Sequence, residues 1–280
     1  MKHHLLIPKI FNFRFKLFDE SHKLESNWLI IILFIVYIVA MTALMIWQGI
    51  GIAPDRYAFV LLLGSLLIKR TRSFILDWLP FIFILISYDF LRGLVPFLNS
   101  HVNYQLLIDL ETFIFGIIPT IYLQDQFLHL PNLSWYDYAA TIFYFLHFAL
   151  PLGFGFLLWI ENKSYFKQFV VAISLLSYAA WATFVIFPSS PPWLSSEKGY
   201  LPEVTKILDH TLGAFPASYE LPTFYHKMNP NPVAAVPSLH GAYPFLVLLF
   251  CLYIFKWKSL LFLPYVIGVW ASVTYLGEHY

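Results

Sequence analysis

The chain has 280 residues, of which 59% are hydrophobic and only 12% charged, and its formal net charge is +1. A soluble domain carries about 25% charged residues, so a soluble core could not bury this much apolar surface. The composition therefore predicts an all-α, polytopic transmembrane helix bundle. The near-neutral charge argues against nucleic acid as a partner, and the single cysteine, Cys251, excludes a disulfide framework and a thiol metal site.

The first 26 residues carry basic side chains interleaved with phenylalanines, among them Phe11, Phe13 and Phe15. No apolar stretch with a small-residue cleavage site follows promptly, so this segment does not resemble a signal peptide. Cationic and aromatic side chains together are typical of segments that lie at the membrane interface. We therefore expect residues 1–26 to lie along the cytoplasmic leaflet.

Transmembrane spans follow from the apolar runs. A bilayer core about 30 Å thick needs roughly 20 helical residues. Runs of this length, or near it, predict seven spans: 28–48, 55–69, 73–95, 136–159, 166–187, 240–256 and 258–276. The second of them is the shortest.

The positions of lysine and arginine predict the orientation in the membrane. With a cytoplasmic N-terminus, twelve basic residues fall in inner segments and four in outer segments. The positive-inside rule favours this orientation. The last two spans are joined by a tight inner turn at 256–258, so they form an antiparallel hairpin. His240 begins the first of these spans and His279 follows the second, so both should lie near the same extracytoplasmic boundary.

These spans divide the chain into four parts. The interfacial segment 1–26 is followed by transmembrane helices at 27–95, an extracytoplasmic interfacial segment at 96–134, and a catalytic transmembrane core at 135–280. The core contains a long outer loop at 188–239. Because the segment 96–134 has no lysine or arginine, part of it could lie as a lid or re-entrant piece at the interface.

Two histidines on one membrane face could perform metal-free phosphoryl transfer. A neutral imidazole can attack phosphorus, and a second imidazolium can protonate the departing oxygen. Ser238 and the first backbone N–H groups of the following helix would face the phosphate, because a helix N-terminus favours anions. The alternative is that His240 is an interfacial histidine beside a capping serine and that His279 only ends a helix.

Three sequence motifs resemble those of a known family. Residues 237–240 (Pro-Ser-Leu-His) and 275–280 (Tyr-Leu-Gly-Glu-His-Tyr) resemble the second and third signature motifs of the type 2 phosphatidic acid phosphatase superfamily. Residues 187–193 (Phe-Pro-Ser-Ser-Pro-Pro-Trp) resemble a segment of the branch that contains inositol phosphorylceramide synthases. Residues 235–240 also fit that branch's Ala-x-Pro-Ser-Leu-His form. The resemblance covers about residues 85–280.

The resemblance implies a role for each matching residue. His279 corresponds to the nucleophile that forms a phosphohistidine, and His240 to the histidine that protonates the leaving group. Ser238 corresponds to a phosphate-contacting serine. The family is metal-independent, so the resemblance implies no metal site and no cofactor.

The chain also departs from the phosphatase pattern. Val273 stands where the phosphatase branch has an arginine, and Trp193 stands where a related branch has an arginine after Pro-Pro. These departures favour the transferase branch. A cation should still meet the phosphate, and Arg92 is the main candidate, although it could instead snorkel at a helix end or pair with Asp89. Weaker candidates are the loop residues Lys198, Lys206 and Lys227.

The family places an aspartate four residues after the nucleophile and one more span after it. Both would lie beyond Tyr280. Either this sequence is a fragment in which the last span of the family core is missing, or the protein lacks a catalytic part; we expect a fragment.

Further residues are candidates for the substrate pocket. His147 lies in the middle of a span, where an ionisable side chain is costly and commonly functional. It could instead be a neutral histidine that bonds to a neighbouring helix. The remaining candidates come from the motifs and are Pro192, Trp193 and Tyr275.

Together these features predict a membrane-embedded phosphotransferase that moves a phospho-headgroup between lipid or alcohol acceptors, with phospholipid or sphingolipid substrates. One alternative is a lipid phosphate phosphatase of the polyprenyl or phosphatidate type. The other is a membrane bundle without catalytic activity. The sequence does not indicate an oligomeric state.

Overall fold

The computed structural model describes Leu61, residues 71–215 and residues 231–280. The N-terminal segment 1–26 and the predicted span 28–48 lie outside the described residues. The predicted span 55–69 lies outside them except for Leu61, which is buried.

The described part of the chain is helical and contains no strand beyond isolated bridges. The long helices are α3 (Thr71–Leu98), α6 (Trp135–Glu161), α7 (Lys163–Ile186), α11 (Leu239–Phe255) and α12 (Leu263–Tyr275), with the 3-10 helix η4 (Lys256–Phe262) between the last two. The short helices are α4 (Leu106–Phe115), α5 (Pro119–Phe127), α8 (Pro192–Glu197) and α9 (Ile207–Gly213). The all-α prediction is confirmed.

Three helical runs in the described residues are long and apolar enough to cross a membrane: Ser73–Leu98, Lys163–Ile186 and Leu239–Tyr275. The number rises to five if each of two bent pairs forms one span. These pairs are α4 with α5, bent by 72°, and the two halves of α6, bent by 45°. The predicted count of seven spans therefore stays a prediction.

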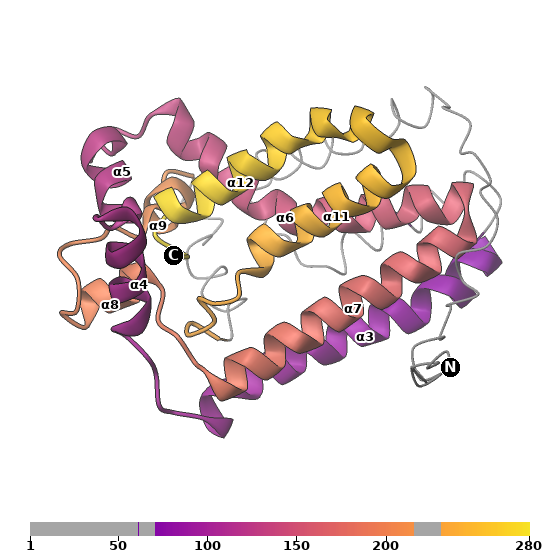
Figure 1. Ribbon diagram of the computed structural model, residues 1–280, viewed down its shortest axis with the longest axis horizontal. Helices are drawn as coiled ribbons and strands as arrows, with labels where there is room; N and C mark the ends of the chain where they lie inside the picture. The colour runs from indigo at the N-terminus through magenta and orange to yellow at the C-terminus, as the bar shows by residue number, and fades with distance from the viewer. Residues whose placement is uncertain (1–60, 62–70, 216–230) are drawn as a thin grey trace, which may run out of the picture.

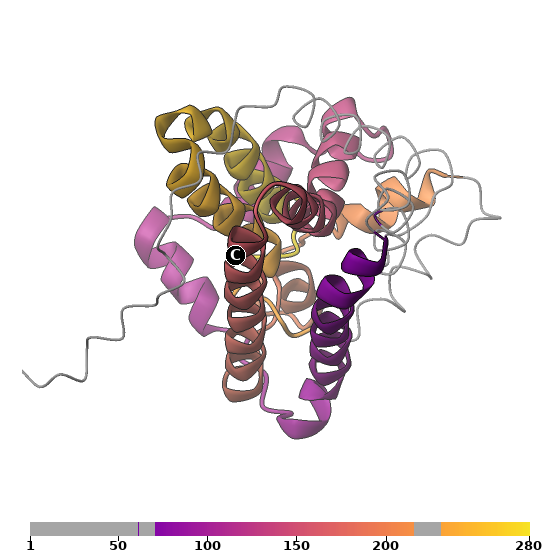
Figure 2. The same ribbon diagram turned by 90° about the vertical axis from the view of Figure 1, so that its right-hand side faces the viewer.

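The last of these runs folds back on itself. Figure 1 shows α11 and α12 as two antiparallel legs joined at η4, and the view in Figure 2 sets this yellow hairpin apart from α3. The predicted hairpin is thus present. It returns the end of α12 to the end of the bundle where α11 begins.

Aromatic side chains from four helices form the main core. Phe74 and Trp78 of α3, Trp159 of α6, Phe169 of α7 and Tyr243 of α11 belong to one cluster of buried residues. The opposite faces of the helices remain apolar and exposed, as at Phe83 and Phe90 of α3. A bundle that is apolar on both its inner and its outer surface suits a hydrocarbon environment.

A polar contact joins three helices at the end of the bundle where α6 meets α7. The Lys163 ammonium lies 2.6 Å from a carboxylate oxygen of Asp77. The Trp159 indole N–H donates to the same oxygen at 2.7 Å. This cluster ties α3, α6 and α7 together.

At the opposite end, α4, α5, α8 and α9 gather beside the C-terminus (Figure 1). Three chain segments pair there through their backbones. The Ser189 amide donates to the Val233 carbonyl at 3.0 Å, and the Ala235 amide donates to the Ser189 carbonyl at 3.2 Å. The Asn103 amide donates to the Pro188 carbonyl at 2.8 Å. These bonds hold the Pro-Pro-Trp segment against the segment that leads into α11.

A tight turn after α12 carries the chain to His279. The amides of Glu278 and His279 both donate to the Val273 carbonyl at 3.2 Å. Gly277 has a φ of +79°, a conformation that only glycine adopts readily. A β carbon there would lie 3.2 Å from the Thr205 carbonyl oxygen. Glycine is therefore required at this position both by the backbone conformation and by the space around it.

We expect Gly277→Ala to lower the thermal stability of the protein and to reduce turnover by about 100-fold, because a displacement of about 1 Å at a reacting group has effects of this size. Gly199→Ala is a matched control: Gly199 also has a φ of +79° but has no atom within 4 Å of the added carbon. It should show only the backbone cost of about 1–2 kcal/mol. Gly213→Ala, in open space at the end of α9, should be neutral. Thermal unfolding in detergent and turnover are measured for all three, and equal effects at positions 199 and 277 would contradict the steric argument.

Candidate active site

His240 is held at the first turn of α11 by the capping of that helix. Ser238 is the N-cap residue, and its hydroxyl oxygen accepts a hydrogen bond from the Gly241 amide at 3.3 Å. The capping function predicted for Ser238 is confirmed. A hydroxyl that accepts one bond keeps its own O–H group as a donor, so Ser238 remains able to donate to an anion at the helix start.

The structure brings His240 and His279 into direct contact. Nδ1 of His240 lies 3.0 Å from Nε2 of His279, and Nδ1 of His279 lies 2.8 Å from the Ala235 carbonyl oxygen. Because a carbonyl only accepts, Nδ1 of His279 carries the hydrogen. Its Nε2 therefore holds a lone pair and accepts from His240.

His279 is buried, with 6% of its surface exposed. Burial lowers the pKa of His279 to about 4, so its ring is neutral at neutral pH. A neutral ring with a lone pair on Nε2 is the form in which a histidine acts as a nucleophile.

The two imidazole rings are in direct contact, with no space for a phosphate between their facing nitrogens. An in-line displacement places the reacting phosphorus about 3–3.5 Å from the attacking nitrogen, and the leaving oxygen lies a further hydrogen bond of about 2.8 Å from its acid. The two nitrogens, now 3.0 Å apart, must therefore separate before a phosphate can lie between them. An entering phosphate would replace the hydrogen bond between the histidines.

His147 lies against this pair. Its ring centroid is 3.8 Å from that of His240, and its Nδ1 is 2.6 Å from the Tyr144 carbonyl oxygen of the same helix. The alternative of a bond to a neighbouring helix is wrong for this nitrogen, because the carbonyl belongs to the preceding turn of α6. His147 is the last residue of the first half of α6, just before the bend of 45°.

Arg92 approaches the site from α3. Its guanidinium lies 3.0 Å from the Asp89 carboxylate, so the local pair considered as an alternative does form. The charge of Arg92 also acts electrostatically on both His147 and His240. The pairing with Asp89 and a position near the histidines are therefore compatible.

The Pro-Pro-Trp segment is bonded to the turn that carries His279. The Trp193 amide donates to the Gly277 carbonyl at 3.2 Å. Pro192, which is buried, is the first residue of α8, and Trp193 follows it. The Lys206 ammonium lies 4.2 Å from the centre of a Trp193 ring, a cation–π contact. Lys198 follows α8 at its C-cap, and Lys227 lies outside the described residues.

Tyr275 serves a different contact from the one expected of a pocket residue. Its hydroxyl donates to the carboxylate of Asp137, a buried residue at the start of α6. The same carboxylate accepts from the Ser134 amide and caps α6. Tyr275 thus fastens the end of α12 to the start of α6, and the structure does not direct its hydroxyl toward the histidine pair.

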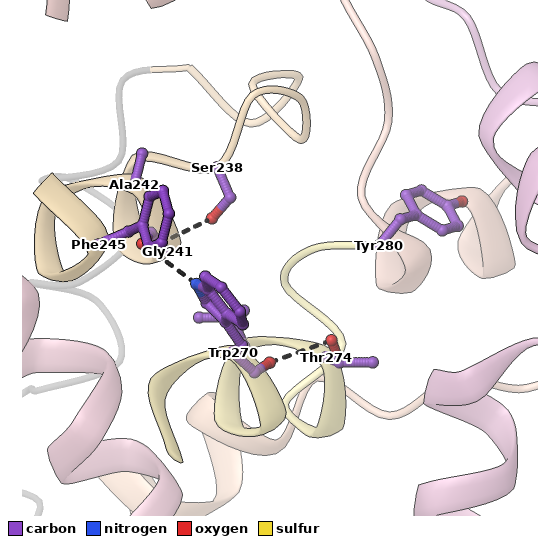
Figure 3. A pocket seen from close by; sticks show the side chains of 8 residues that line it. Ser238, Gly241, Ala242, Phe245, Trp270, Thr274 and Tyr280 are labelled. Carbon is purple, nitrogen blue, oxygen red and sulfur yellow. Dashed lines mark hydrogen bonds between the residues drawn. The ribbon is translucent and has the colours of Figure 1, made fainter. Parts of the chain in front are cut away.

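A cavity of about 300 Å³ opens between α11 and α12; Gly241 and Tyr280, the chain neighbours of His240 and His279, line it, but the histidines themselves do not. Figure 3 shows Ser238 and Trp270 at this cavity, with the Trp270 indole donating to the Gly241 carbonyl. A second hollow of about 670 Å³ shares Thr274 and Tyr280 with the first. It is walled mainly by apolar residues of α4 and α5, such as Leu110. Both hollows are lined mainly by apolar surface with a few polar side chains, which suits a ligand that is largely hydrocarbon.

Sequence reasoning missed three groups at this site. Gln124 clamps the site by donating to the carbonyls of Thr205 and Tyr275, both at 2.9 Å. The Ala235 carbonyl orients His279, and the Tyr144 ring stacks on His240 at 4.0 Å. A glutamine in an outer segment without lysine or arginine was a weak signal for Gln124, whereas a main-chain carbonyl and a core tyrosine give no signal in the sequence.

No group of three or more His, Cys, Asp or Glu side chains suited to hold a metal occurs among the residues that the structure describes. The metal-free prediction remains a prediction. The chemistry that the described geometry offers is that of two imidazoles, a hydroxyl, free helix amides and one guanidinium.

An apolar helix bundle with two histidines in contact at one end defines a class of membrane enzyme, and comparison with known proteins identifies it. The PAP2 superfamily matches residues 106–280, so the chain belongs to this superfamily. This supports a membrane-embedded lipid phosphotransferase or phosphatase.

The chain is similar to the phosphoinositol dihydroceramide synthase of Bacteroides thetaiotaomicron, with 28% identity over 219 residues, which are 75% of this chain and 72% of the relative. The predicted resemblance to the superfamily and to its inositol phosphorylceramide synthase-like branch is therefore confirmed. No solved structure matches the chain.

Proposed function

We propose that this protein transfers a phosphorylated headgroup from a phospholipid to a lipid alcohol through a phosphohistidine at His279. The observation that carries the proposal is the pair of His240 and the buried His279, 3.0 Å apart at the end of a membrane bundle. Membership of the PAP2 superfamily supports the same chemistry.

In the first half of the reaction, Nε2 of His279 attacks the phosphorus of the donor. The bond between phosphorus and the oxygen of the donor's lipid alcohol breaks, and a proton from His240 neutralises the departing alkoxide. The headgroup is left as a phosphodiester-like adduct on His279. The hydrogen bond from Nδ1 of His279 to the Ala235 carbonyl supports this step, because it stabilises the positive charge that the ring gains.

In the second half, the acceptor alcohol takes the place of the departed lipid. His240, now neutral, accepts the proton of the acceptor hydroxyl as its oxygen attacks phosphorus. The bond between phosphorus and His279 breaks, and both histidines return to their starting protonation states. The two imidazoles supply the nucleophile and the acid–base group, so the mechanism uses no metal ion or cofactor.

The charge on the phosphate is stabilised by three kinds of donor in this proposal. Ser238 and the free amides at the start of α11 face the anion, as a helix N-terminus favours. Arg92 provides the positive charge from α3, a role supported by its electrostatic effect on His240. Pro192 and Trp193 act by holding the His279 turn in place.

The proposed headgroup is phosphoinositol and the proposed acceptor is a dihydroceramide. This substrate class rests on the name of the bacterial relative, a phosphoinositol dihydroceramide synthase. The apolar hollow walled by α4 and α5 supports a lipid substrate, since its volume is about 670 Å³. The charge distribution along the sequence favours a site on the extracytoplasmic face.

Acceptor dependence tests the proposed function. The purified protein is incubated in vesicles with phosphatidylinositol labelled in the inositol ring, with and without dihydroceramide. We expect labelled phosphoinositol dihydroceramide and one diacylglycerol per transfer when the acceptor is present, and at least about tenfold less label released without it. Release of water-soluble inositol phosphate at the same rate in both samples would instead identify a phosphatase, the alternative function of the same superfamily.

A further inference from the structure

Two residues of α6 pack their rings against His240. The Tyr144 ring lies 4.0 Å from the His240 ring, centre to centre, and the two are nearly parallel, with an angle of 22°. The His147 ring lies 3.8 Å from it at an angle of 46°. Tyr144 and His147 are three residues apart, so both project from the same face of α6.

Tyr144 itself is fixed in place. It is buried, with 4% of its surface exposed, and it belongs to the apolar cluster formed with Ile207, Leu208 and Val273. Its ring also meets that of Phe145 edge to face. A ring held from several sides can impose an orientation on the imidazole that stacks on it.

The charges around His240 make this stacking important for an acid. The titratable and charged groups that act on it are His147, His279 and Arg92. Each of these is positive when charged, so none of them favours a second positive charge on His240. The electron-rich face of a tyrosine ring attracts a cation, and Tyr144 presents that face.

We propose that Tyr144 is a positioning residue for His240, whose ring face orients the imidazole and stabilises the imidazolium that donates a proton to the leaving lipid alcohol. This inference rests on the proposed function, in which His240 is that acid. Tyr144 contacts neither phosphorus nor the leaving oxygen in this scheme and acts through His240 alone.

The test compares Tyr144→Leu, Tyr144→Phe and Phe143→Leu by the pH dependence of kcat/KM for labelled phosphatidylinositol with dihydroceramide present. The high-pH limb of this profile reports loss of the acid's proton in the free enzyme. In Tyr144→Leu we expect the midpoint of this high-pH fall in kcat/KM to shift to lower pH by about half a unit or more. We also expect kcat to fall by about tenfold. Tyr144→Phe keeps the aromatic ring, so its high-pH midpoint should equal that of the wild type.

Phe143→Leu is the structural control, because Phe143 lies on α6 next to Tyr144 but packs against Tyr265 instead. Phe143→Leu should lower the thermal stability of the protein without shifting the high-pH midpoint of kcat/KM. The inference would be overturned if the high-pH midpoint of Tyr144→Leu equalled that of the wild type. It would also be overturned if Tyr144→Phe lost as much activity as Tyr144→Leu. If the wild-type protein transfers no headgroup, both the proposed function and this inference are overturned. If the wild type is active but the high-pH midpoint of Tyr144→Leu is unchanged, only the inference is refuted.

Discussion

Replacing His279 with alanine is expected to reduce headgroup transfer by about four orders of magnitude or more. The substitution removes the atom that attacks phosphorus, and the loss of a covalent nucleophile has effects of this size in enzymes that use one. The remaining groups at the site would still bind the donor, so KM should change far less than kcat. Initial rates with labelled phosphatidylinositol and dihydroceramide measure the effect.

His101→Ala is the matched control for this variant, because His101 is exposed and lies in the loop after α3. It should retain wild-type turnover. Both variants are first shown to be folded by their elution from a sizing column and by thermal unfolding in detergent. Turnover within tenfold of the wild type in a folded His279→Ala protein would rule out the nucleophile assigned here.

Replacing His240 with alanine is expected to have an effect that depends on the leaving group. For a lipid donor, whose alkoxide needs a proton to depart, kcat should fall by about 10²–10⁴-fold, the usual contribution of general acid catalysis. A nitrophenyl phosphodiester of inositol releases a stable phenolate that needs no proton. The first step with that donor should therefore be nearly unaffected in His240→Ala.

The release of nitrophenolate in the first turnover provides this comparison directly. A burst of one nitrophenolate per protein in His240→Ala, followed by slow turnover, is the expected result, because the second step still needs a base. An equal loss for the lipid and nitrophenyl donors would show that His240 does not act as the acid. It would leave His240 with a role in binding or folding only.

Much of the bundle could be predicted from apolar runs and charge. The runs 73–95, 136–159 and 166–187 agree with α3, α6 and α7 to within three residues at each end. Length and polarity determine these elements, and both can be read from residue types. The number of spans is a different matter, because it depends on whether a bent pair such as α4 and α5, which are joined by a left-handed Gly116 and begin again at Pro119, forms one span.

The meeting of His240 and His279 was also predictable, for a simple physical reason. A short turn at 256–258 forces two apolar runs to lie antiparallel, so residues at their far ends must meet. The structure brings the two rings within hydrogen-bonding distance. The catalytic roles of these residues remain proposals that the experiments above address.

The details that orient the pair could not be predicted. The Ala235 carbonyl fixes the tautomer of His279, and the bond from the Trp193 amide to Gly277 fixes the turn. Main-chain groups are the same in every residue, so no sequence pattern marks the ones that matter. Tyr144 is similar, since a buried tyrosine in an apolar helix does not reveal which ring it will stack on.

Trapping of the covalent intermediate tests the central claim most directly. The protein is mixed with phosphatidylinositol labelled with ³²P, without acceptor, and quenched in alkali within milliseconds to seconds. We predict an acid-labile, alkali-stable label on the peptide that contains His279, absent from His279→Ala and discharged when dihydroceramide is added before the quench. Turnover with no protein-bound label at any time, or label that persists in His279→Ala, would contradict transfer through a phosphohistidine at this residue.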